Sequence, residues 1–141
     1  MYQSYNLSHT DALKIIAAIQ AELEKANKGA AIAVADAHGE LIAFLRLDGC
    51  KLPSLNIAIN KAFTAAREGA ESKTVGQRSR DEGFPMTNFG DLRYTAWGGG
   101  VPITYQGKVI GAVGVSGVPE EEDMALARLG VKVFEQIVGS S

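Results

Sequence analysis

Apolar residues recur at helical spacing in three long segments of the chain, a pattern typical of amphipathic helices. These segments begin near Ser8, Ser54 and Pro119, residue types that favour the start of a helix, and Ser54 is the expected N-cap of the second. Asp11 follows Ser8 at the spacing of a capping box, in which a hydroxyl and a carboxylate satisfy free amide donors. We therefore expect three main helices and a shorter helical segment over residues 73–80.

Shorter apolar runs bounded by turn residues predict strands between these helices. Gly39 lies in the first connecting turn, where it supplies the positive φ of a β-hairpin, and Gln106-Gly107 forms the second turn. Because hairpins pair strands in antiparallel fashion, we expect one α/β (α+β) domain over residues 1–141, with an antiparallel sheet of about five strands covered by helices. The expected strands cover residues 30–35, 40–47, 92–97, 103–105 and 109–115.

Residues 98–117 hold seven of the sixteen glycines of the chain, including the triplet Gly98-Gly99-Gly100. A glycine weakens a strand, because it contributes no side-chain packing and has extra backbone freedom to lose. Such a density of glycine in an apolar stretch predicts that another body packs directly on the backbone. The candidates are a neighbouring element, a second subunit or a flat ligand.

The segment over residues 81–91 has the glycine, proline and asparagine content of an irregular loop. It also carries the apolar residues Phe84, Met86 and Phe89, which a solvated loop does not need. We therefore expect this loop to fold over a pocket or a partner subunit.

Charge and composition exclude several classes of protein. The formal net charge is −2 and no basic run occurs, so neither nucleic acid nor an anionic membrane is an expected partner. The single cysteine, Cys50, excludes an intrachain disulfide. The first residues lack the pattern of a signal peptide, and no apolar run reaches the roughly 20 residues needed to span a bilayer. These features favour a cytoplasmic protein.

Five short motifs in this order resemble those of the GlcG/HbpS family, which includes haem-binding proteins and the C-terminal domain of PduO-type corrinoid adenosyltransferases. The resemblance covers nearly the whole chain from about Leu7 to the last helix. The motifs are Ala33-Val34-Ala35-Asp36 with Gly39-Glu40-Leu41, Arg46-Leu47-Asp48-Gly49, Lys61-Ala62-Phe63-Thr64-Ala65, Gly98-Gly99-Gly100-Val101-Pro102-Ile103, and Ile110-Gly111-Ala112-Val113-Gly114-Val115-Ser116-Gly117 followed by Asp123.

The resemblance implies a profilin-like fold that assembles into homo-oligomers. It implies tetrapyrrole binding in some members, and a place in operons for glycolate, glycerol or propanediol metabolism in others, but no settled catalytic activity. The leading hypothesis is a small-ligand-binding protein, with haem or another tetrapyrrole as the ligand. The alternatives are an enzyme or accessory protein of that metabolism, with or without a corrinoid, and a purely structural subunit.

Two histidines and one cysteine are candidate ligands of haem iron, because imidazole and thiolate are common axial ligands. His9 at the start of the first helix is preferred, because a helix start can lie at a subunit contact. For His38 the interpretation as a turn residue is favoured over a role as iron ligand, and for Cys50 the interpretation as a small buried side chain is favoured. No pair among the three has the spacing of a zinc motif.

Several other residues are candidates for binding an anionic or flat ligand. Arg46 can clamp a carboxylate in bidentate fashion, or pair with Asp48 two residues on. Lys61 can reach an acidic ligand from the second helix, or extend to solvent. Trp97 beside the glycine triplet can stack on a ring or join the core, and Ser116 precedes the last helix, where amide donors favour anions. The expected ligand-binding set is Arg46, Asp48, Lys61, Trp97, Gly98, Gly99, Gly100 and Ser116.

Overall fold

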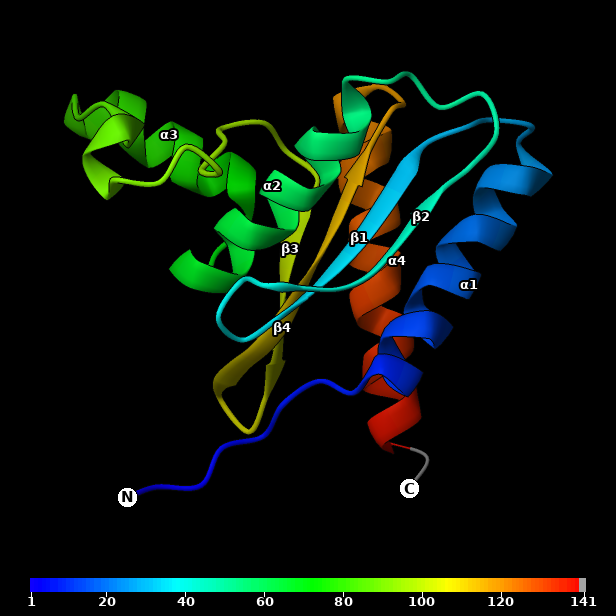
Figure 1. Ribbon diagram of the computed structural model, residues 1–141, viewed down its shortest axis with the longest axis horizontal. Coiled ribbons are helices and arrows are strands. Elements are labelled where there is room, and N and C mark those ends of the chain that lie inside the picture. The colour runs from blue at the N-terminus through cyan, green and yellow to red at the C-terminus, as the bar shows by residue number, and fades with distance from the viewer. Residues whose placement is uncertain (140–141) are drawn as a thin grey trace.

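Residues 1–139, the part of the chain that the computed structural model describes, form four strands and four α-helices (Figure 1). The strands β1 (Ala31–Asp36), β2 (Leu41–Arg46), β3 (Gly100–Tyr105) and β4 (Lys108–Ser116) make one antiparallel sheet in the order β2-β1-β4-β3. The two hairpins are joined by the central pair of β1 and β4, in which Ala33 lies opposite Gly114. Residues 140 and 141 of the expected domain lie outside the described part.

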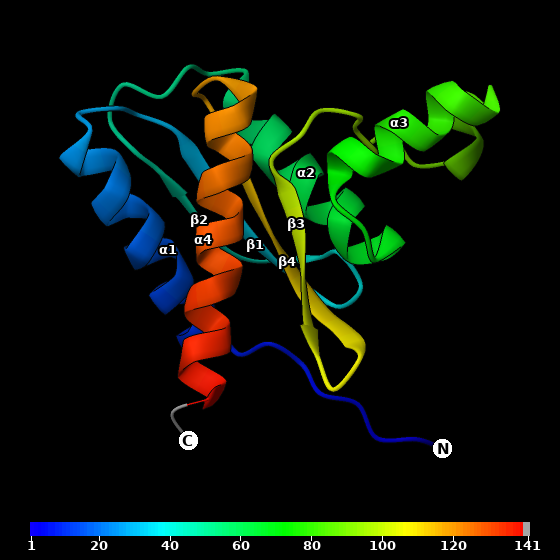
Figure 2. The same ribbon diagram turned by 180° about the vertical axis from the view of Figure 1, so that it is seen from behind.

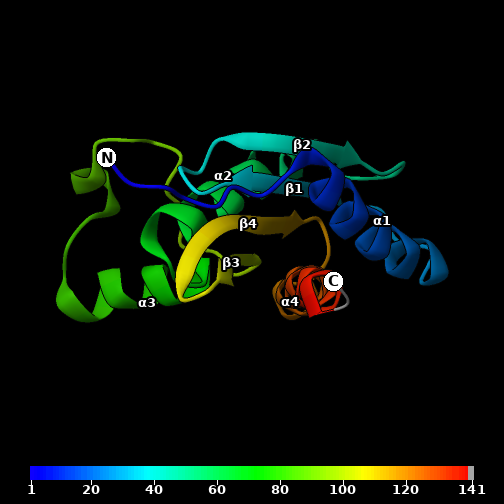
Figure 3. The same cartoon turned by 90° about the horizontal axis from the view of Figure 1, so that it is seen from below.

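Helices cover both faces of the sheet. α1 (His9–Lys25) and α4 (Glu120–Gly139) pack against one face, and α2 (Ser54–Glu68) packs against the other (Figure 2). α3 (Ser72–Glu82) and the short 3₁₀ helix η1 (Met86–Phe89) follow α2, and α3 lies on the far side of the molecule from α1 (Figure 3). The α/β fold with an antiparallel sheet covered by helices is therefore confirmed.

The two faces of the sheet carry side chains of different size. Because successive residues of a strand point to opposite faces, Ile32 and Val34 of β1 join the large aliphatic core beneath α1 and α4. Ala31, Ala33 and Ala35 point the other way, toward the alanines of α2. The core beneath α1 and α4 thus contains large aliphatic side chains, whereas β1 presents only alanines to α2.

The glycines of β3 and β4 let α2 lie directly on the strand backbone. A Cβ atom at Gly114 would collide with the carbonyl oxygen of Ala58, and one at Gly100 would collide with that of Lys61. The body that packs on these two glycines is thus a neighbouring element of the same chain. The sequence left open a neighbouring element, a second subunit or a flat ligand, and the neighbouring element accounts for Gly100 and Gly114.

The expectation of about five strands is wrong by one. Residues 92–97 form no strand: they contain a turn at 92–93 and a bend at Trp97, with half-buried side chains at most positions. The amide of Thr95 donates to Thr64 Oγ1 of α2 at 3.0 Å, and the amide of Arg93 donates to Asp91 Oδ1 at 2.9 Å. Because side chains satisfy these backbone donors, the segment needs no neighbouring strand.

The helix boundaries agree with the sequence in most places. The Asp11 amide donates to Ser8 Oγ at 3.1 Å, so Ser8 is the N-cap of α1, and residues 73–80 lie within α3. Ser54 was expected to cap α2, but Pro53 occupies that position and Ser54 is the first helical residue. Every helix of residues 1–139 is too short or too polar to cross a membrane.

Candidate functional site

A pocket of about 460 Å³ opens where α2 and α4 begin and β4 ends, at the top of the molecule in Figure 1. Its floor is polar, and Trp97, Ile57, Val118 and Pro119 give it an apolar wall. Four residues predicted from the sequence line it together, namely Lys61, Trp97, Gly98 and Ser116. The remaining lining residues are Lys51, Ser54, Gly117, Glu120 and Asp123.

A buried ion pair forms the floor of the pocket. Lys61 Nζ donates to Asp123 Oδ2 at 3.0 Å and to the Val115 carbonyl oxygen at 2.9 Å. The two side chains are only 3% and 5% exposed, so Lys61 does not extend to solvent. Gly99 makes room for this ammonium, since a Cβ atom there would lie 2.8 Å from Lys61 Nζ.

Besides pairing with Lys61, Asp123 stabilises the turn before α4. Its Oδ1 accepts the amide of Val118 at 3.2 Å. Burial raises the pKa of Asp123 above its ordinary value, while the Lys61 ammonium and the neighbouring amide donors act in the opposite direction. The carboxylate therefore depends on Lys61 to remain charged in this buried position.

Two serines of the pocket are nearly buried as residues, and their hydroxyls reach the pocket without a hydrogen-bond partner in the protein. Ser54 is 7% and Ser116 is 5% exposed, and neither hydroxyl bonds to any other group within residues 1–139. Ser72 nearby is different, because its hydroxyl donates to the Trp97 carbonyl at 2.7 Å and accepts the Gly100 amide at 2.9 Å. Within residues 1–139 no fully buried side-chain nitrogen or oxygen lacks a hydrogen-bond partner, so the Ser54 and Ser116 hydroxyl oxygens remain in contact with solvent in the pocket, where a ligand can reach them.

A contact to α4 fixes the backbone at the mouth of the pocket. Trp97 is 59% exposed at the rim. Next to it, the Gly98 amide donates to Glu120 Oε2 at 3.2 Å, and Glu120 also pairs with Lys73 of α3. The hydrogen bond from Lys73 lowers the pKa of Glu120 below its ordinary value. Glu120 is thus engaged by its own chain.

The remaining predicted residues lie outside this pocket. Gly99 and Gly100 are buried behind it, against Lys61. Arg46 is exposed at the end of β2, and Asp48 lines a separate polar depression with Glu24 and Lys28. Cys50 is buried, and this burial raises the pKa of its thiol.

Neither histidine lies in the pocket. His9 is exposed as the first residue of α1, which begins at the end of the molecule where α4 ends, whereas the pocket lies where α4 begins (Figure 1). His38 is exposed in the β1–β2 turn. Within residues 1–139 no three His, Cys, Asp or Glu side chains form a group that suits a metal ion.

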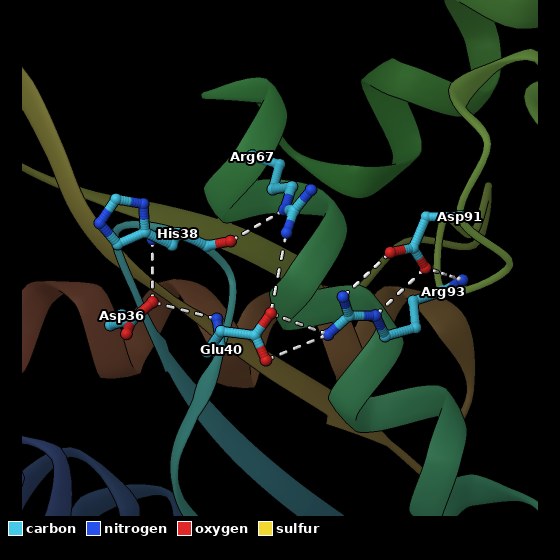
Figure 4. A network of polar contacts seen from close by, with 6 residues as sticks. All are labelled: Asp36, His38, Glu40, Arg67, Asp91 and Arg93. Carbon is cyan, nitrogen blue, oxygen red and sulfur yellow. Dashed lines mark hydrogen bonds and ion pairs between the residues drawn. The ribbon is translucent and has the colours of Figure 1, made fainter.

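Sequence reasoning missed a surface network that joins the β1–β2 hairpin to the loop before β3 (Figure 4). Glu40 accepts from Arg93 at 3.1 Å and pairs with Arg67 at 3.7 Å, while Arg93 also pairs with Asp91 at 2.9 Å. The Arg93 and Arg67 guanidinium carbons lie 3.9 and 4.6 Å from the centre of the Phe63 ring. In the sequence, the only signal for this network is the closely spaced pair Asp91 and Arg93 in the loop.

The helix-covered antiparallel sheet defines an α/β protein, and the pocket at the end of the sheet lies in the size range of small-ligand sites. The family model described as "Haem degrading protein HbpS-like" matches residues 7–132. The chain therefore belongs to the HbpS-like family, and its resemblance to GlcG and HbpS proteins is confirmed.

Individual relatives agree with this assignment. Protein GlcG of Escherichia coli is 40% identical over 116 residues, which cover 78% of this chain and 81% of that protein. A crystal structure of a double mutant of HbpS from Streptomyces reticuli is 30% identical, with a TM-score of 0.85, and covers 94% of this chain and 90% of that one. The crystal structure of a PduOC:haem complex shares the fold at 23% identity, with a TM-score of 0.83 and coverage of 92% and 95%.

Proposed function

We propose that this chain is a cytoplasmic small-ligand-binding protein whose ligand is haem or another tetrapyrrole, held at the pocket between α2, α4 and the end of β4. The observation that carries the proposal is the pocket itself, in which an exposed tryptophan stands beside a polar floor. Indole rings stack on flat aromatic ligands, and the floor suits polar substituents. The fold shared with a protein crystallised with haem supports the same ligand class.

The pocket suits the ring of a tetrapyrrole better than its metal. Within the described chain, the pocket lining includes no histidine, cysteine, methionine or tyrosine, the side chains that usually ligate haem iron. An axial ligand must therefore come from elsewhere. We infer that His9 of a second copy supplies it, since the start of α1 is exposed and distant from the pocket of its own chain.

This role for His9 requires a homo-oligomer. Large apolar side chains remain exposed near the pocket, with Leu52 at 64% and Trp97 at 59%. Such side chains favour burial against a partner when they gather beside a site. A second copy that covers the pocket mouth would bury both and close the site from water.

Haemin titration tests the proposal. We expect wild-type protein to shift the Soret band of haemin at one equivalent per site, and Trp97→Ala to weaken binding by about tenfold through loss of stacking. His9→Ala should change the position of the Soret band, whereas the matched control His38→Ala should not. If wild-type protein leaves the Soret band unchanged, the haem proposal is wrong.

The polar floor also favours the second candidate, an enzyme or accessory protein that acts on a short hydroxy acid or diol, with or without a corrinoid. Serine hydroxyls and an ammonium group that line the pocket can bind a small polar molecule without any ring. A thermal-shift series with cobalamin, glycolate and propanediol separates the two candidates. Stabilisation by these compounds but not by porphyrins would favour the second.

A further inference from the structure

We propose that the floor of the pocket binds a carboxylate group of the ligand, through the hydroxyls of Ser54 and Ser116 and the ammonium of Lys61. This inference rests on the proposed ligand site and names the chemical group that its polar end recognises. A carboxylate belongs both to the side chains of a tetrapyrrole and to a free short hydroxy acid. The floor would form the same hydrogen bonds with a carboxylate from either source.

The two serine hydroxyls provide the first argument. They come from different elements, α2 and β4, and both line the same pocket while more than nine-tenths buried. Their oxygens keep contact with solvent through the pocket, so a ligand can replace water as the hydrogen-bond partner there. Each hydroxyl can donate one hydrogen bond, and carboxylate oxygens accept such bonds well.

The ammonium of Lys61 provides the second argument. A lysine ammonium has three N–H donors, and Lys61 uses one for Asp123 Oδ2 and one for the Val115 carbonyl. Within residues 1–139 no third acceptor contacts it. Because Lys61 lines the pocket, the third N–H is available to a bound acceptor.

The balance of charge around the floor also admits an anion. Lys61 and Asp123 neutralise each other, and Lys73 neutralises Glu120, which leaves the positive charge of Lys51 at the mouth. The other two carboxylates of the first turn of α4 do not line the pocket: Glu122 pairs with Lys28, and Glu121, 82% exposed, lies 3.7 Å from Lys73.

The start of α2 adds to this effect. Its first turn contains no acidic residue, and no described side chain caps its amides. The positive end of the helix dipole therefore reaches the pocket uncompensated. Together with Lys51, it favours a negatively charged group beside Ser54.

The experiment compares ligands with and without a free carboxylate. One arm titrates haemin and haemin dimethyl ester, and the other measures thermal shifts with glycolate and glycolamide. We expect wild-type protein to bind haemin about tenfold more tightly than the ester, or to be stabilised by glycolate and not by glycolamide. The first result assigns the carboxylate to a tetrapyrrole, and the second assigns it to a free acid.

The variant Ser54→Ala/Ser116→Ala is the test of the residues. Both hydroxyls lack partners in the protein, so the melting temperature of this variant should equal or exceed that of wild type, while its preference for the carboxylate form is lost. Ser72→Ala serves as the matched control, because it removes a bonded hydroxyl and should lower the melting temperature without changing the preference.

The outcomes separate this inference from the proposed function. If haemin and its ester bind equally well and glycolate has no effect, the carboxylate inference is wrong while tetrapyrrole binding stands. A preference that survives in the double serine variant also overturns it. If glycolate stabilises the protein through the two serines and haemin does not bind, the haem proposal fails and the carboxylate inference stands. Absence of binding in both arms overturns both.

Discussion

Lys61 and Asp123 are the residues whose removal tells most about the pocket. Each is nearly inaccessible to water, and each is the main charged partner of the other. A buried charge that loses its partner is strongly unfavourable, because the protein interior replaces neither its hydration nor its counter-charge. The stability of the protein should therefore fall much more when one member of the pair is replaced than when both are replaced.

We expect Lys61→Met to lower the free energy of unfolding by about 3–5 kcal/mol at pH 7, because it leaves the Asp123 carboxylate unpaired. Lys61→Met/Asp123→Asn should be less destabilised than the sum of the two single variants. Urea unfolding measures all three. Lys28→Met is the matched control, because its pair with Glu122 is nearly half exposed and should contribute at most about 1 kcal/mol.

The same pair should respond to pH with a definite sign. Burial raises the folded-state pKa of Asp123 above its unfolded value, so its contribution to stability is greatest below the unfolded pKa and is lost as the pH rises through the folded pKa. Without Lys61 this pKa should rise further. The loss of stability in Lys61→Met should consequently be smaller at pH 5 than at pH 7, and an equal loss at both would contradict the buried pair.

Sequence reasoning identified Lys61 as a candidate but not its environment. The lysine and its carboxylate are 62 positions apart, and only the packing of α2 against β4 and α4 brings them together. Local signals were sufficient for Ser8, whose partner is three residues away. They were not sufficient for Ser54, because the cap position is decided by where the backbone turns before α2.

At the scale of elements, the contact between α2 and the sheet is set by small residues. Alanines of β1 and α2 and glycines of β3 and β4 let the helix approach the strand backbone. Close approach increases the number of atoms in van der Waals contact, but it leaves no space for added side-chain atoms. Larger side chains at the contact between α2 and the sheet should therefore be very poorly tolerated.

Gly114→Ala should lower the free energy of unfolding by about 3 kcal/mol or more, because its methyl group would meet the Ala58 carbonyl and force α2 from the sheet. Chemical denaturation followed by circular dichroism measures the change. Gly139→Ala is the matched control, since open space surrounds that position near the end of α4. Similar stability of the two variants would show that α2 is not seated on the strand.

The sequence predicted most elements correctly and failed where tertiary contacts replaced local ones. Helical periodicity and turn residues located the four helices and both hairpins. The segment over residues 92–97 has strand-like composition, yet its amides bond to Thr64 and Asp91. The high glycine content indicated a close neighbour, but it did not distinguish a helix from a ligand.

At the scale of the whole molecule, the loop before β3 connects the charged network to the pocket. Arg93 and Tyr94 hold the loop against Phe63 of α2, and Glu40 of the β1–β2 hairpin holds Arg93. A few residues later the same loop places Trp97 at the pocket mouth. Docking of the loop should therefore influence how well the pocket is formed.

We expect Arg93→Ala to increase amide hydrogen exchange over residues 84–97 by roughly three- to tenfold, with little change in β1 and β4, because it frees the loop without opening the core. Exchange followed by mass spectrometry measures this. Arg128→Ala removes another bidentate pair, with Glu71 of the neighbouring helical region, and should leave the loop unchanged. Uniform faster exchange throughout Arg93→Ala would instead indicate global destabilisation.

One helix serves both of these regions. Ser54 and Lys61 of α2 belong to the pocket, while Phe63, Thr64 and Arg67 of the same helix support the loop and the charged network. Because α2 rests directly on the strand backbone at the glycines of β3 and β4, few side chains between helix and sheet can rearrange when one end of the helix is displaced. The helix therefore moves as a rigid body. An axial shift of α2 by even a fraction of its rise per residue would change the pocket and the charged network together.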